Sequence, residues 1–118
     1  MIVVDNDTWI ENQFGEVQLA DKRRNAGLIK VAAHMLNAPE QSIPTQSTEW
    51  SDTKAAYRLF NNPNVTFDAI AGPHWQQTRQ TKPGRYLLIS DTTELDYTNH
   101  QATSGLQQIG NGGGRGIL

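Results

Sequence analysis

Residues 21–37 read DKRRNAGLIKVAAHMLN, and this segment decides the fold because it carries the clearest helix pattern in the chain. Asp21 is a favourable N-cap residue, and apolar side chains then recur at three- and four-residue spacings, as on one face of a helix. Pro39 follows closely and ends the pattern. The sequence therefore predicts a helix over residues 21–37, whose apolar face consists of Leu28, Val31, Ala32, Met35 and Leu36.

A second helix is predicted over residues 51–61, after turn-like residues around Pro44. Lys54 and Arg58 are four residues apart, so they share one face of this helix. Two helices joined by a short polar turn, with paired basic residues on the second, have the outline of a helix-turn-helix, although many such helix pairs bind no DNA. The other, apolar face of the second helix is expected to consist of Trp50, Ala56, Leu59 and Phe60.

Two further helices are predicted in the same part of the chain. Asp7 or Thr8 is expected to cap a short first helix that ends near Gly15. Thr66 is expected to cap a later helix, which is interrupted at Gly72–Pro73, where the proline begins a renewed helix. The front of the chain is therefore predicted to be mainly α-helical.

The composition limits the class of protein. With 118 residues, of which 36% are hydrophobic and 19% charged, the chain has room for one packed domain and at most an incomplete second one. The absence of Cys excludes disulfides, thiolate nucleophiles and Cys-based zinc sites, and it fits a reducing cytoplasm. The sequence contains no apolar run of the roughly 20 residues that a membrane span needs. We therefore expect a cytoplasmic protein without a membrane partner.

The charges are distributed unevenly along the chain. The net charge is only -2, and residues 1–20 carry four acidic residues and no basic one. Residues 21–85, in contrast, carry nine Lys or Arg and five Asp or Glu, so this middle part is basic by four charges. A basic segment of this kind is a modest electrostatic signal for a polyanion such as nucleic acid.

The pattern changes after Pro83. Residues 86–90, YLLIS, form a continuous apolar run, which predicts a strand buried on both faces. The later sequence GNGGGRG, at residues 110–116, lacks the lysine of a phosphate-binding loop and is predicted to be a mobile turn between two strands. Because a central strand without neighbours is not stable, we expect the chain to be the front part of a longer architecture.

Three acidic residues follow the apolar run. Asp91 comes directly after the predicted strand, and Asp side chains at strand ends hold Mg²⁺ in two-metal phosphoryl-transfer sites. Alternatively, Asp91 caps the turn after the strand. Glu94 and Asp96 either support a metal site or are merely exposed, and their spacing gives no sign of the opposed acids of a glycosidase. The three His residues have no spacing typical of metal ligands.

Four stretches of this sequence together resemble one family. They are FGEVQLADKRRNAGLIKVAAHM, SIPTQSTEWSDTKAAYRLFNNPNVT, ISDTTELDYT and GLQQIGNGGGRGIL. In this order they resemble the N-terminal part of bacterial cut-and-paste DDE transposases of the IS-four type, over about residues 9–118. The resemblance implies a helix-turn-helix-like DNA-binding domain at residues 1–82. It also implies the first strands of an incomplete RNase H-like α/β domain at residues 83–118.

The resemblance also implies a function. In that family the helical domain binds the terminal inverted repeats of the element, so double-stranded DNA is the expected partner, together with other copies of the transposase in a synaptic complex. Asp91 matches the first acid of the DDE triad, which is a ligand of Mg²⁺ or Mn²⁺. The other two acids of the triad are absent from this sequence, so we expect a chain at the bacterial nucleoid that binds DNA without cutting it and holds no divalent ion tightly.

Eight residues are candidates for DNA contacts by this resemblance. Basic side chains at matching places are expected to meet phosphates, whereas polar side chains near the turn are expected to reach base edges. Gly27 and Asn37 stand where the transposon-five enzyme of that family has basic residues, so the recognised DNA sequence is expected to differ. The candidates are Arg23, Arg24, Lys30, Lys54 and Arg58 for phosphates, and Thr45, Gln46 and Ser47 for bases.

Two other classes remain open at this stage. The chain could be a stand-alone DNA-binding regulator that occupies transposon ends and inhibits a transposase, which would be distinguished by whether the reading frame continues past Leu118. It could also be a metal-dependent hydrolase that uses Asp91, Glu94 and Asp96 together, which would require tight binding of Mg²⁺ or Mn²⁺.

Overall fold

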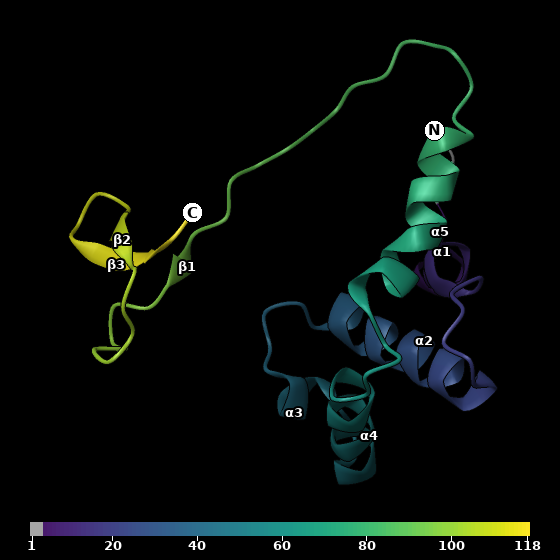
Figure 1. The fold of residues 1–118 in the computed structure, drawn as a ribbon, viewed down its shortest axis with the longest axis horizontal. Coiled ribbons are helices and arrows are strands. Elements are labelled where there is room, and N and C mark those ends of the chain that lie inside the picture. Colours follow the sequence, from purple (N-terminus) through teal and green to yellow (C-terminus); the bar gives the residue numbers. More distant parts are fainter. Residues whose placement is uncertain (1–3) are drawn as a thin grey trace. The chain divides into compact units, whose positions relative to one another are not determined.

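The computed structural model describes residues 4–118 and divides the chain into two compact units, Met1–Lys82 and Pro83–Leu118. The first unit is helical and the second contains a small antiparallel sheet (Figure 1). The prediction of a mainly helical protein is therefore confirmed. Within residues 4–118, every helix is too short or too polar to cross a bilayer.

Five helices make up the described part of the first unit. The helix predicted at residues 21–37 is confirmed as α2, and the helix predicted at 51–61 as α4. A four-residue helix, α3, lies where only a turn was expected, and Pro44 fits its first turn because the N–H groups there have no helical partner. The helices are α1 (Asn6–Phe14), α2 (Lys22–Asn37), α3 (Ile43–Gln46), α4 (Trp50–Phe60) and α5 (Phe67–Arg79).

The caps of the first two helices differ in how well the sequence indicated them. Asp21 caps α2, as predicted, by accepting a hydrogen bond from the backbone N–H of Arg23 at 2.7 Å. The cap predicted for α1, Asp7 or Thr8, was wrong, because Asp5 accepts from both the backbone N–H and the hydroxyl of Thr8. Asp5, Asp7 and Thr8 are all good capping residues, so their order alone could not decide between them.

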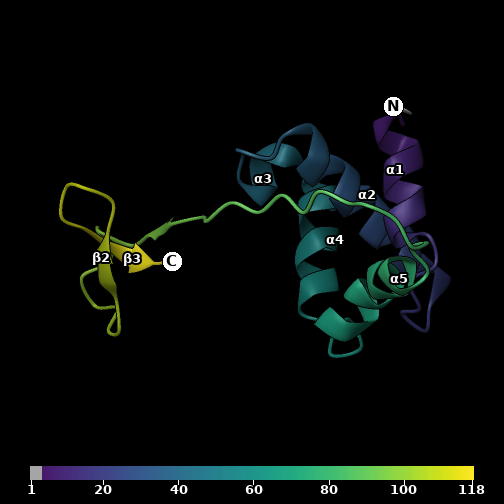
Figure 2. The same ribbon diagram turned by 90° about the horizontal axis from the view of Figure 1, so that it is seen from above.

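The predicted interruption at Gly72–Pro73 was also wrong, since α5 is continuous with Pro73 inside it. A proline removes one helical hydrogen bond and usually bends a helix, but side-chain contacts can hold the two halves together. Here the rings of Phe67 and Trp75 meet edge to face across the proline, with centroids 5.9 Å apart. The C-terminal half of α5, after Pro73, also contacts α1, beside which α5 packs (Figure 2). There the Gln77 amide donates to the carbonyl oxygen of Asn12 at 2.6 Å.

The core of the first unit lies between α2, α4 and the connection after α1. Asn25 holds this connection: its amide nitrogen donates to the carbonyl oxygen of Val17 at 2.7 Å, and its amide oxygen accepts from the N–H of Leu19. The polar backbone is thereby satisfied, so both apolar side chains can be fully buried. The buried cluster consists of Val17, Leu19, Leu28, Val31, Ala56 and Leu59.

The predicted apolar faces of α2 and α4 are only partly buried. On α2, Leu28 and Val31 are buried, whereas Met35 and Leu36 are exposed and line an apolar groove of about 420 Å³. On α4, the assignment of Trp50 to the apolar face was wrong, because its side chain is 68% exposed. Residues of a helix are rotated by about 100° each, so Trp50 points about 120° away from Ala56 and the core. Phe60, from the same predicted face, is also exposed.

The second unit contains three short strands, β1 (Leu95–Asp96), β2 (Gln107–Ile109) and β3 (Gly114–Ile117), in the order β1-β3-β2. Both neighbouring pairs are antiparallel. The glycine-rich segment forms the turn between β2 and β3, as predicted, and two of its residues, Gly110 and Gly113, have positive φ.

The buried strand predicted at residues 86–90 was wrong. These residues form no strand, and their apolar side chains lie in solvent, with Leu88 95% exposed. In the described residues the sheet consists of β1, β3 and β2, and its pairing begins at Leu95. The run 86–90 therefore has no neighbouring strand, and an apolar run without neighbouring strands has nothing to be buried against.

Candidate nucleic-acid interface

Three arginines converge on a groove between α2 and α4 in the first unit. The groove has a volume of about 390 Å³. The two helices that form it run at a steep angle to each other (Figure 1). We call it the arginine groove. It is lined by Arg23, Arg24 and Gly27 of α2, by Ala55, Arg58 and Leu59 of α4, and by Asn62 just after α4.

Local sequence places the three guanidinium groups. The Asp21 cap starts α2, so that Arg23 and Arg24 fall in its first turn, and Arg24 donates to the carbonyl oxygen of Leu19 at 3.0 Å. Arg58 lies in the last turn of α4, where the helix dipole favours a cation. Gly27 leaves the groove open, since a Cβ at this position would meet nothing within 4 Å. The groove can therefore admit an anionic group such as a phosphate.

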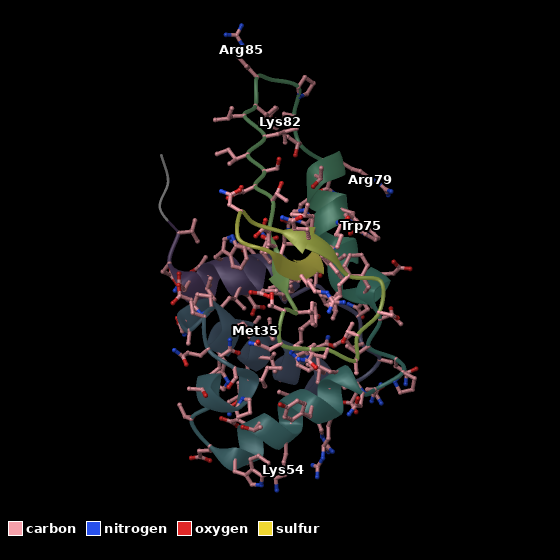
Figure 3. All side chains as sticks on the ribbon, turned by 90° about the vertical axis from the view of Figure 1, so that its left-hand side faces the viewer. Met35, Lys54, Trp75, Arg79, Lys82 and Arg85 are labelled. Atoms are coloured by element: carbon pink, nitrogen blue, oxygen red, sulfur yellow. The ribbon has the colours of Figure 1, made fainter. Side chains whose placement is uncertain are left out.

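The exposed side of α4 continues from this groove. Lys54 lies one turn before Arg58, and its side chain extends from α4 into solvent (Figure 3). The structure thus brings four of the five predicted phosphate-binding residues to the arginine groove or to the adjacent side of α4. The spacing of Lys54 and Arg58 indicated their shared face, but no sequence signal showed that Arg23 and Arg24 would meet Arg58.

Lys30, the fifth predicted phosphate contact, has a different setting. Its ammonium nitrogen lies 2.6 Å from Oδ1 of Asp52 and so connects α2 with α4. The Lys30 side chain is 58% exposed and that of Asp52 only 12%. The hydrogen bond from Lys30 holds the pKa of Asp52 below its ordinary value. Lys30 does not line the arginine groove, and its positive charge is balanced locally.

The three polar residues predicted to reach base edges lie on α3 and its end. The Gln46 amide donates to the carbonyl oxygen of Ala38 at 3.0 Å, and the Ser47 hydroxyl donates to that of Ile43 at 3.1 Å. Thr45 is exposed, and its hydroxyl shares a hydrogen bond with that of Ser42. Two of the three predicted base contacts therefore serve the local fold, and Thr45 is the most accessible.

The acidic residues of the second unit are each engaged with nearby backbone. Asp91 is exposed and accepts from the N–H of Thr92 at 2.8 Å. Glu94 accepts from the N–H of Gly110, which connects the start of β1 with the glycine-rich turn. Asp96 accepts from both the N–H and the hydroxyl of Thr98, and these bonds lower its pKa.

These acids do not form a metal site by themselves. Within residues 4–118, no group of three or more His or acidic side chains is placed so that it could hold a metal ion. The donors of residues 4–118 are therefore not arranged as in a two-metal centre, which needs several carboxylates around each ion.

One comparison with known protein families bears on this interface. A family model described as transposase DNA-binding matches residues 6–65. The matched segment runs from the start of α1 to beyond the end of α4. It therefore includes every residue that lines the arginine groove, as well as Lys54 and the exposed side of α4.

Proposed function

The chain belongs to the transposase DNA-binding family, and from this we propose that it is the N-terminal part of an IS-four-type cut-and-paste transposase that binds the terminal inverted repeats of its element. DNA is its partner. The observation that carries the proposal is the arginine groove, in which Arg23, Arg24 and Arg58 come from two helices of the matched segment.

The groove suits the DNA backbone chemically. A guanidinium group can donate two parallel hydrogen bonds to one phosphate, and it remains charged at every physiological pH. Each phosphate that is neutralised releases counterions, so the logarithm of the affinity falls with that of the salt concentration by about 0.9 per contact. Arg23, Arg24 and Arg58 together with Lys54 would therefore give a steep salt dependence, while Lys30 acts mainly by holding α2 against α4 through Asp52.

Phosphate contacts position a protein on DNA but do not read its sequence. The bases would be read by polar residues at the turn, of which Thr45 is the most accessible. Gln46 and Ser47 would have to give up their present hydrogen bonds to take part.

For the second unit we propose that Asp91 is the first acid of a DDE triad, at the start of an RNase H-like domain. Support comes from its place directly after the apolar run 86–90 and before an antiparallel sheet. One such acid cannot form the two-metal site, so this chain alone would bind DNA without cutting it, and Mg²⁺ or Mn²⁺ would be held only with the remaining acids. Copies of the parent enzyme would pair DNA ends at the bacterial nucleoid.

Selection from a random duplex library at fixed salt tests the proposal. The purified chain is expected to enrich one sequence, to bind it well above scrambled duplex, and to lose affinity with rising salt. That sequence should then occur at both ends of the mobile element. If nothing is enriched, the proposal fails. If a sequence is enriched but the reading frame does not continue into a second Asp and a Glu, the chain is a stand-alone regulator of transposition.

A further inference from the structure

Trp50 is the most exposed tryptophan of the described residues, with 68% of its side chain in solvent. It is the first residue of α4, and no aromatic ring of residues 4–118 packs against it. Tryptophan is normally well buried, because its large ring loses much by remaining in water. Tryptophan and arginine are both enriched at binding interfaces, so an exposed tryptophan on the same side of a helix as cationic side chains is a candidate contact residue.

The position of Trp50 connects it with the arginine groove. Trp50, Lys54 and Arg58 follow one another at intervals of four residues, so they form one stripe along α4. Tyr57, which is also exposed, lies beside this stripe. The opposite side of α4 is buried through Thr53, Ala56 and Leu59. Trp50 therefore lies on the exposed side of α4, together with Lys54 and with Arg58, which also lines the arginine groove.

The charges along α4 separate two kinds of contact. Lys54 and Arg58 lie toward the C-terminal half of the helix, where they attract phosphates. Glu49, which is exposed, directly precedes Trp50 at the N-terminal end, whereas Asp52 is paired with Lys30. Carboxylates repel phosphates, so this end of the helix does not suit the DNA backbone. The base edges in the major groove are the remaining part of the duplex that the end of α4 can contact.

We propose that Trp50 recognises thymine in the major groove, an inference that rests on the DNA-binding function proposed above. An indole ring offers an apolar face and a single N–H donor, and it has no acceptor. Thymine presents a methyl group next to an acceptor, O4, and so matches both features. Cytosine presents an amino donor at the corresponding position, for which the indole has no acceptor. Trp50 thereby determines part of the recognised sequence.

Deoxyuridine provides the test, because it removes only the methyl group of thymine. In the duplex enriched by the selection, each thymine is replaced singly by deoxyuridine. The wild-type chain is expected to lose affinity about fourfold at one or two positions, as expected for one buried methyl group. Trp50→Ala is expected to bind about tenfold more weakly, within the range of one lost base contact. It is also expected to show no further loss with deoxyuridine at those positions.

Two variants provide controls. Trp50→Phe keeps an apolar ring without the N–H, so it is expected to keep the deoxyuridine effect while discriminating less against cytosine. Trp75→Phe alters the exposed tryptophan of α5, which lies far from Lys54 in the first unit (Figure 3), and is expected to behave like the wild type. Trp50 carries no charge, so its replacement should leave the salt dependence unchanged, in contrast to Arg58→Ala.

The outcomes separate the two proposals. If Trp50→Ala keeps the wild-type affinity and remains sensitive to deoxyuridine at the same positions, the thymine proposal is overturned. The proposed DNA-binding function survives that result on two conditions. The wild-type chain must prefer the selected duplex, and Arg58→Ala must show a flatter salt dependence than the wild-type chain. If the wild-type chain itself does not distinguish selected from scrambled duplex, both proposals fail together.

Discussion

Lys30 and Lys54 are the same residue type on adjacent helices, but their charges have different surroundings. Lys30 is paired with Asp52 at 2.6 Å, whereas Lys54 extends into solvent (Figure 3) one turn before Arg58 in α4. We expect Lys54→Ala to weaken DNA binding and to reduce the salt slope by about 0.9, the value of one phosphate contact. Lys30→Ala should reduce the slope by less. Fluorescence anisotropy titrations over a salt series measure both slopes.

Arg79 is the matched control for Lys54, because it is a basic residue at the opposite end of the first unit (Figure 3). Arg79→Ala changes the net charge by the same amount but lies away from the arginine groove. If it reduces the salt slope as much as Lys54→Ala does, the chain responds to net charge alone and the arginine groove has no special part in binding.

The pair of Lys30 and Asp52 also predicts a pH dependence. The hydrogen bond from Lys30 lowers the pKa of Asp52 from its ordinary 3.8. A carboxyl group with a lowered pKa in the folded state contributes stability that is fully present above its unfolded pKa and is lost as the pH falls through the folded pKa. We therefore expect Lys30→Met to raise the pKa of Asp52 in a carboxyl NMR titration and to remove this part of the acid sensitivity. Lys54→Met should leave that pKa unchanged.

At the scale of elements, Gly27 lies inside α2 with free space around its Cα. A glycine within a helix costs about 1 kcal/mol relative to alanine, and a Cβ here would touch nothing. Gly27→Ala should therefore raise the melting temperature of the helical unit by about 4–8 °C. Its methyl group would, however, project into the arginine groove, where we expect it to weaken DNA binding about tenfold by displacing a phosphate contact.

Gly72 offers a comparison in α5, because it is also a glycine inside a helix and does not line the arginine groove. Gly72→Ala should leave DNA binding unchanged, and it should stabilise the unit less than Gly27→Ala does, because a Cβ directly before Pro73 disfavours the helical conformation. Equal binding by both variants would mean that no part of the DNA approaches Gly27. The two melting curves measure the helix effect separately from the binding effect.

The same elements show why some features could be predicted from the sequence. The helix α2 could be predicted, because its N-cap residue and the periodic spacing of its apolar residues are local signals. The continuity of α5 through Pro73 could not be predicted, since the packing of α5 against α1, where Gln77 donates to Asn12, is a tertiary contact. The run 86–90 has the composition of a buried strand, but a strand depends on partners that a local pattern does not contain.

For the candidate interface, the sequence indicated the basic residues but not their arrangement. Nothing in the spacing of Arg23 and Arg58 shows that they line one groove, because that follows from how α4 crosses α2. Lys30 and Asp52 are likewise far apart in the sequence, so their ion pair was not foreseen. Trp50 was assigned to the apolar face of α4 with Ala56, although it points about 120° away from Ala56 and is exposed.

At the scale of the whole molecule, each unit has its own set of stabilising contacts. The buried cluster and both helical grooves are formed by residues of the first unit alone. In the second unit, Gly116 is essential to the sheet, because a Cβ there would collide with the carbonyl oxygen of Leu95. Gly112, in the turn, has free space around it. The two glycines therefore allow the sheet to be disturbed separately from the helices.

We expect residues 1–82 to fold alone and to bind the selected duplex with the affinity of the full chain, because every side chain of the arginine groove is present in them. In the full chain, Gly116→Ala should abolish the NMR signals typical of the β1–β3 pairing and leave DNA affinity unchanged, whereas Gly112→Ala should change neither. Anisotropy titrations and amide NMR spectra of the three proteins measure these effects. If residues 1–82 bind the duplex more than about tenfold more weakly than the full chain does, then residues 83–118 contribute at least one base contact of typical energy. The DNA-recognition surface would then extend beyond the helical unit.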